Sequence, residues 1–300
     1  MSFTTKSLAI ESGNLMNLSA VVITSIGILS SFFTIFMNIY FIKKITRIRH
    51  RMIFFFYRIF VDISYGVLAC AYMIFCILYS YFTEELREKQ GFIVYLGFPL
   101  QSVAAIRTII AVAISIERVL ALCTPVLFHN YRHRFPSIII LILAVCSGIF
   151  EDLVLFQSCT LNLSNIPRNC GVLRCAVDKC FFDHWADRSI MYALNFLCSG
   201  LLSIKLIFFN KSLNGQGEHS KASVNHIALL DAANVFLCDF LPNSISNYAA
   251  QFEFSSFQNI GPYIYIIKLF GIAIETCFIC WILKLKNTQY QPNTVLPLQK

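Results

Sequence analysis

The chain has 300 residues, of which 57% are hydrophobic and only 13% are charged, and its formal net charge is +8 at pH 7. A soluble protein is about 45–50% apolar and about 25% charged, so this chain has too few polar side chains to cover a water-facing surface. The composition excludes a soluble globular domain, a disordered chain and a coiled coil. It indicates an integral membrane protein.

Long apolar stretches predict an all-α membrane protein built as a bundle of seven transmembrane helices. A membrane-spanning helix needs roughly 20 mostly apolar residues. In chain order, the stretches that meet this requirement lie at about residues 18–42, 59–82, 92–117, 135–157, 189–209, 224–250 and 260–283. Residues 1–17 form a short segment before the first span, and residues 284–300 form a short tail after the last.

The basic residues predict how the bundle is oriented. Fourteen Lys and Arg side chains fall in the connections that follow spans one, three, five and seven, against seven on the opposite side. Basic residues in short loops favour the cytoplasmic side of a membrane. We therefore expect an extracellular N-terminus and a cytoplasmic C-terminus.

The loop between spans four and five is expected outside and holds four cysteines, Cys159, Cys170, Cys175 and Cys180. An even number of clustered cysteines in an oxidising compartment favours one or two disulfides. The sequence does not choose among the possible pairings, and the even spacing of the last three leaves a zinc site as an alternative. Asn162 begins an Asn-Leu-Ser sequon in the same loop and is a glycosylation candidate.

No string typical of a metallopeptidase, a serine hydrolase, a phosphate-binding loop or a dinucleotide-binding loop occurs in the chain. The six histidines are scattered, and none has a second ligand at helical spacing within a span. We therefore expect no enzymatic activity, no catalytic residue, no cofactor and no metal.

Ionisable residues inside the expected spans are the main candidates for a functional role. An unpaired charge at the centre of a span costs at least about 2.5–3.5 kcal/mol, so each should face the bundle interior and find a partner. Counting the helical rise from the outer ends sorts them by depth. The outer set is expected to line a ligand pocket and comprises Arg107, Asp239 and Lys268. The deeper set is expected to form a polar switch core and comprises Asp62, Asp231 and Glu275, together with Asn38.

The alternative for these residues is a set of structural ion pairs that fix the register of the helices. Pro242 lies in span six near Asp239 and should kink that helix. A kinked helix beside a buried charge is a natural hinge, although a kink of no functional consequence is the competing interpretation.

Several residues together resemble the rhodopsin-like G-protein-coupled receptors. They are the Glu117-Arg118 pair at the inner end of span three with Pro125 after it, Asn38, Asp62 and Pro242. Three features depart from that pattern. Span seven has no Asn-Pro-x-x-Tyr, Asp239 stands where a Trp is usual before Pro242, and no cysteine lies at the outer end of span three.

With these departures, the chain resembles the nematode serpentine chemoreceptors, most closely class BC. The stretches that carry this likeness begin at Thr24, Met37, Phe128, Cys170 and Leu229. The resemblance implies a receptor for smell or a soluble cue in the plasma membrane of sensory neurons, in their cilia. Its partners would be the lipid bilayer, a small-molecule ligand and a heterotrimeric G protein, with no nucleic acid. Glu117 would hold Arg118 at rest, and both would take part in G-protein coupling.

A ligand-gated ion channel or a membrane transporter is the alternative, because either would also use charges inside the membrane. The chain shows no internal repeat and no series of like charges along one span, which are the features that would favour them. The sequence does not predict the ligand, the G-protein subtype, the disulfide pairing or the oligomeric state.

Overall fold

The computed structural model describes residues 16–45, 53–124, 137–158, 170–173, 233–242 and 261–289, with a few single residues between them. The single residues are 126, 128, 130, 194, 197, 198, 200, 201, 204, 230 and 245. Across these ranges the secondary structure is helical, and no strand occurs in them. The chain is an all-α membrane protein.

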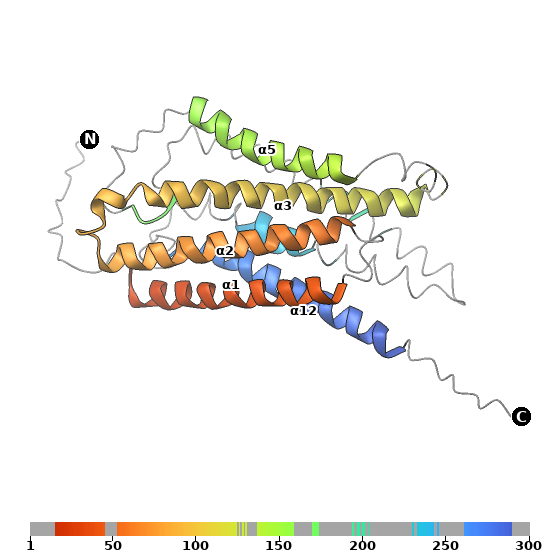
Figure 1. The fold of residues 1–300 in the computed structure, drawn as a ribbon, viewed down its shortest axis with the longest axis horizontal. Coiled ribbons are helices and arrows are strands. Elements are labelled where there is room, and N and C mark those ends of the chain that lie inside the picture. The colour runs from red at the N-terminus through yellow and green to blue at the C-terminus, as the bar shows by residue number, and fades with distance from the viewer. Residues whose placement is uncertain are drawn as a thin grey trace, which may run out of the picture.

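Five long helices and two short helical segments make up the described fold (Figure 1). The long helices are α1 (Leu18–Ile45), α2 (Ile53–Tyr81), α3 (Phe92–Cys123), α5 (Ser137–Ser158) and α12 (Tyr263–Gln289). The short segments are the 3-10 turn η2 (Arg87–Lys89) and the π-helical segment η4 (Val235–Phe240).

Helix α2 lies between α1 and α3, and α5 packs on the other side of α3. Helix α12 returns to pack along α1 and also contacts η4 and α2. The first and last helices of the chain therefore pack against each other, and both contact α2. This arrangement brings the charged residues of α2, α3 and α12 within reach of one another.

Of the helices in the described ranges, three are long and apolar enough to cross a membrane, over Leu18–Lys43, Ile53–Tyr81 and Tyr263–Trp281. Their outward faces expose large apolar side chains such as Leu29 and Phe36 of α1 and Phe270 of α12. Exposing these apolar faces to water would cost free energy, whereas lipid tails solvate them. Helix α3 is continuous but carries Arg107, Glu117 and Arg118, and it packs between α2 and α5.

The apolar core lies between α2, α3 and α12. Its buried residues are Tyr65, Ala69, Tyr72, Met73, Cys76, Tyr79, Ile93, Leu100, Ala104, Tyr265, Ile266, Leu269 and Ile272. A second cluster at the N-terminal end of α2 joins Phe54 and Phe55 of α2 to Ile110 and Ile114 of α3 and Ala144 of α5. The buried charges Arg58, Asp62, Arg107 and Glu275 lie between these two clusters along the helices, whereas buried Lys268 lies beside the first.

A glycine turn places the start of α12 against α1. Gly261 has a φ of +68°, and a Cβ there would come within 2.7 Å of the Thr24 hydroxyl and 3.0 Å of Met16. Glycine is the residue that adopts this backbone without strain. Pro262 follows and opens the helix, where its missing N–H has no partner to lose.

Helix α3 continues to Cys123 and α12 to Gln289, each beyond its expected span, and α2 begins earlier than expected. This helix begins at Ile53 rather than near residue 59, so it includes Arg58. The extension is stable because Arg58 finds acidic partners inside the bundle. Most of the fifth expected span and much of the sixth lie outside the described residues.

Candidate functional site

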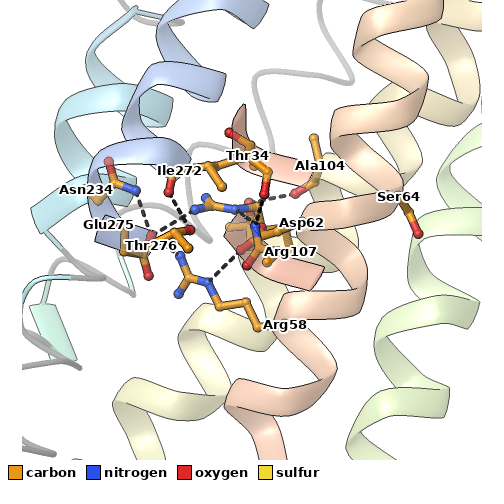
Figure 2. A network of polar contacts seen from close by, with 12 residues as sticks. Thr34, Arg58, Asp62, Ser64, Ala104, Arg107, Asn234, Ile272, Glu275 and Thr276 are labelled. Atoms are coloured by element: carbon orange, nitrogen blue, oxygen red, sulfur yellow. Dashed lines mark hydrogen bonds and ion pairs between the residues drawn. The ribbon is translucent and has the colours of Figure 1, made fainter. Parts of the chain in front are cut away.

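Arg107 of α3 lies at the centre of a buried ion-pair network and is 3% exposed. Its Nε donates to Asp62 Oδ1 of α2 at 2.8 Å, and its Nη2 donates to Glu275 Oε2 of α12 at 3.2 Å. One guanidinium therefore joins three helices, as Figure 2 shows.

A second guanidinium completes the network from α2. Arg58 precedes Asp62 by one helical turn, and its Nη2 donates to Glu275 Oε2 at 2.7 Å. Its Nε lies 3.8 Å from Asp62 Oδ2. We call Arg58, Asp62, Arg107 and Glu275 the ionic quartet. Its two cations and two anions cancel, so the site is formally neutral.

The sixth span reaches the quartet through an amide. Asn234 immediately precedes η4, and its Nδ2 donates to Glu275 Oε2 at 2.8 Å. That carboxylate oxygen thus accepts three hydrogen bonds, one each from Arg58, Arg107 and Asn234. Charge-assisted hydrogen bonds of this kind are about twice as strong as neutral ones.

Close packing holds η4 against α12 just beside this contact. A Cβ on Gly271 would come within 2.4 Å of Asn234 Oδ1 and 2.6 Å of Cys238 Cβ, so only glycine permits the approach. The π-helical winding of η4 inserts an extra residue into the turn, and such segments are frequent at functional sites. Pro242 is buried shortly after it.

A small cavity borders the quartet on its inner side. It has a volume of about 20 Å³, and its lining includes Arg58, Asp62 and Glu275 together with Asn38 of α1. That space is sufficient for about one water molecule, which needs roughly 10–15 Å³. Asn38 Nδ2 donates to Thr34 O at 3.0 Å within its own helix. The cavity is large enough for one water molecule and too small for an organic ligand.

Pairing explains how four charges are stable inside a membrane protein. Each charge is costly alone in a low-dielectric interior, and breaking a buried pair by removing one partner costs about 3–5 kcal/mol. Replacing the complete set by apolar residues is often neutral. The arrangement therefore favours one specific packing of the helices more than it adds overall stability.

The structure groups the intramembrane charges differently from the depth count. Arg107 was expected in the outer set with Asp239 and Lys268, yet its ion pairs join the deeper residues Asp62 and Glu275. The reason is the length of the arginine side chain, which reaches about one helical turn from its backbone. The deeper set is therefore not purely acidic.

Lys268 is 5% exposed and lies two turns before Glu275 on the same face of α12, closer to the outer end. Near it, Gln101 Nε2 of α3 donates to the Tyr265 hydroxyl at 2.7 Å. The backbone of Asp239 belongs to η4, but its side chain lies outside the described part of the structure, as does all of Asp231.

At the inner end of α3, Glu117 and Arg118 lie side by side. Arg118 Nη2 is 3.8 Å from Glu117 Oε2, and both side chains are largely buried. At this distance the two groups form a loose ion pair.

In the outer loop, Cys170 is disulfide-bonded and so presents no thiolate to the zinc site considered as an alternative. Eight other cysteines are free, namely Cys70, Cys76, Cys123, Cys146, Cys198, Cys238, Cys277 and Cys280. Cys159, Cys175, Cys180 and the sequon residue Asn162 lie outside the described residues.

Two members of the site escaped the sequence analysis. Arg58 was passed over because span two was expected to begin after it, although its spacing of four from Asp62 is the signal for a same-face ion pair. Asn234 carries no charge, and a lone amide in an apolar helix gives no signal of its partner.

The long apolar helices, three of which can cross a membrane, fit a multi-pass membrane protein. A protein-family model described as serpentine type 7TM GPCR chemoreceptor Srbc matches residues 16–287. The chain belongs to this serpentine chemoreceptor family. No curated protein matches it with significant similarity. The family is one of receptors, not of enzymes.

Proposed function

We propose that this receptor binds a small extracellular cue within the outer half of the helix bundle and in response activates a heterotrimeric G protein. Membership in the serpentine chemoreceptor family supports the sensory role. The observation that carries the mechanism is the ionic quartet, in which Glu275 Oε2 collects donors from α2, α3 and the start of η4.

The quartet would stabilise the resting arrangement of the bundle. If span six moves relative to α12, Asn234 separates from Glu275, and the buried carboxylate loses one of its three donors. A ligand shifts this equilibrium only when it binds the moved arrangement more tightly than the resting one. Pro242 and the π-helical turn of η4 would serve as the hinge.

Glu117 and Arg118 would couple this movement to the G protein at the cytoplasmic face. In the resting state their ion pair holds Arg118 against the end of α3. Movement of the inner helix ends would free the guanidinium for a G protein. This assignment requires an extracellular N-terminus and a cytoplasmic C-terminus, which the excess of basic residues after the odd-numbered spans favours.

Further assignments remain part of the proposal. Lys268 and Asp239 would line the outer ligand pocket, while Asp231 and Asn38 would extend the polar core. Disulfides among the outer-loop cysteines and glycosylation at Asn162 would fit an extracellular loop. The receptor would act in the plasma membrane of sensory neurons, in their cilia.

The test is a ligand panel applied to cells that express the receptor, with G-protein activation and membrane current recorded together. We expect activation without current, lost in Arg118→Ala at unchanged surface expression. Lys43→Ala, at an exposed basic position near the inner end of α1, is the matched control and should respond normally. A ligand-evoked current that persists without G protein would instead identify a channel.

A further inference from the structure

A short piece of the outer loop is buried inside the bundle. Residues 170–173 lie against α2 and α3, and Cys170 and Leu173 are each 1% exposed. Leu173 is among the largest fully buried side chains of the described residues. A loop residue is normally at the surface, so this burial needs a cause.

Three hydrogen bonds hold the backbone of this segment. The Leu173 N–H donates to the Tyr72 hydroxyl at 2.9 Å, and the Cys76 thiol donates to Gly171 O at 3.4 Å. Gln90 Nε2 donates to Cys170 O at 3.2 Å. All three side chains are buried, so the segment satisfies polar groups that would otherwise lie in a dry interior.

The isobutyl group of Leu173 fills a space that a glycine leaves open. A Cβ on Gly97 of α3 would come within 3.0 Å of both Leu173 Cδ1 and Leu173 Cδ2. Tyr72, which accepts the hydrogen bond from Leu173, packs edge-on against Tyr265 with ring centroids 5.1 Å apart. We call Tyr72, Cys76, Gln90 and Gly97 the Leu173 seat.

We propose that the Leu173 seat is a ligand subsite which the receptor's own loop occupies at rest. The proposal rests on the proposed function, because it assigns a place to the cue that this function requires. The ligand would resemble what it displaces, namely a small branched aliphatic molecule with an amide-like polar end. Its apolar part would lie against Gly97, and its N–H would donate to the Tyr72 hydroxyl.

The segment belongs to the same chain as the seat, so it stays nearby when it is displaced. A tethered competitor has a high effective concentration at its own seat. The apparent affinity for a ligand falls in proportion to the fraction of receptors whose seat is open. Loss of the Leu173 side chain should therefore make the seat easier to occupy.

The buried Cys76 thiol reports directly on whether the segment has left. The full-length receptor in nanodiscs would be treated with a charged methanethiosulfonate reagent. Modification of Cys76 would be obtained by subtracting the labelling of a matched Cys76→Ala receptor, in which only the other cysteines react. We expect slow modification of the wild type. In Leu173→Gly, and independently in Gly97→Ala, modification should be at least about tenfold faster, because each change weakens the fit of the segment.

The probe ligand is 3-methylbutanamide, which carries the isobutyl group and the amide of Leu173. We expect it to slow the modification of Cys76 in Leu173→Gly. Unchanged modification rates in both variants would overturn the proposal, as would faster modification that the probe does not slow. The assay needs no G protein, so a receptor that behaves as expected here but activates none would contradict only the proposed function.

Discussion

Arg107 and Glu275 lie 168 positions apart in the sequence, yet the Arg107 Nη2 donates to the Glu275 Oε2 at 3.2 Å in the interior of the bundle. The same oxygen also accepts from Arg58 and Asn234. Four parts of the chain thus depend on one carboxylate oxygen. A change in the position of any of them leaves a buried charge with fewer partners.

The pairing of Arg107 with Glu275 can be measured by a double-mutant cycle. Arg107→Met and Glu275→Leu each leave an unbalanced charge in the quartet, and we expect each to destabilise the receptor by about 3–5 kcal/mol. The double variant restores neutrality and should lose clearly less than the sum. Thermal unfolding in nanodiscs gives the comparison, and strictly additive losses would mean that the two groups do not interact.

Arg58 should not be replaceable by lysine. Its guanidinium directs Nη2 to Glu275 at 2.7 Å while Nε lies 3.8 Å from Asp62, a forked geometry that one ammonium group does not reproduce. We expect Arg58→Lys to lower the unfolding temperature measurably, and Arg58→Met to lower it further because it also unbalances the charge of the quartet. The same exchange of charge type at exposed Lys43, Lys43→Arg, should have no measurable effect.

The seven-helix class was predictable because apolar length alone identifies a membrane span. Interior positions of charged residues were predictable for the same energetic reason, since Arg107, Asp62 and Glu275 can be stable in a membrane only when they pair. Their actual partners were not predictable. A count of helical rise locates backbones along the membrane normal, whereas Arg107 reaches its partners with a side chain that spans about one turn.

Leu173 shows a different limit. Nothing in its local sequence distinguishes it from any other apolar loop residue, and its burial depends on the space above Gly97, which comes from a different helix. Such a match between distant segments is a property of tertiary packing. It appears only when α2, α3 and the loop are placed together.

The contact between η4 and α12 should tolerate no side chain at Gly271. In Gly271→Ala the new Cβ would lie within 2.4 Å of Asn234 Oδ1 and 2.6 Å of Cys238 Cβ, so one of the two elements must move. Overpacking of this kind costs about 1–3 kcal/mol. We expect a lower unfolding temperature together with raised basal signalling.

Gly200→Ala is the matched control for that substitution, because a Cβ there meets no atom of the described residues within 4 Å. It should leave both stability and signalling unchanged. If Gly271→Ala behaves like Gly200→Ala, the close approach of η4 to α12 is not a feature of the resting receptor.

The measurement that tests the central claim most directly is basal G-protein activation per surface receptor in Asn234→Leu. This nearly isosteric change removes the donor from span six to Glu275 and leaves the quartet itself intact. A hydrogen bond to a charged group contributes about 1.5–3 kcal/mol, and a shift of one or two kcal/mol changes a two-state population by about 5–30-fold. We therefore predict a rise of about that size. Ser64→Ala, which removes an exposed hydroxyl that donates to Phe60 O of the same helix, is the control and should leave basal activation unchanged. Basal activation equal to that of the wild type at equal surface density would contradict the role of the quartet in holding the resting state.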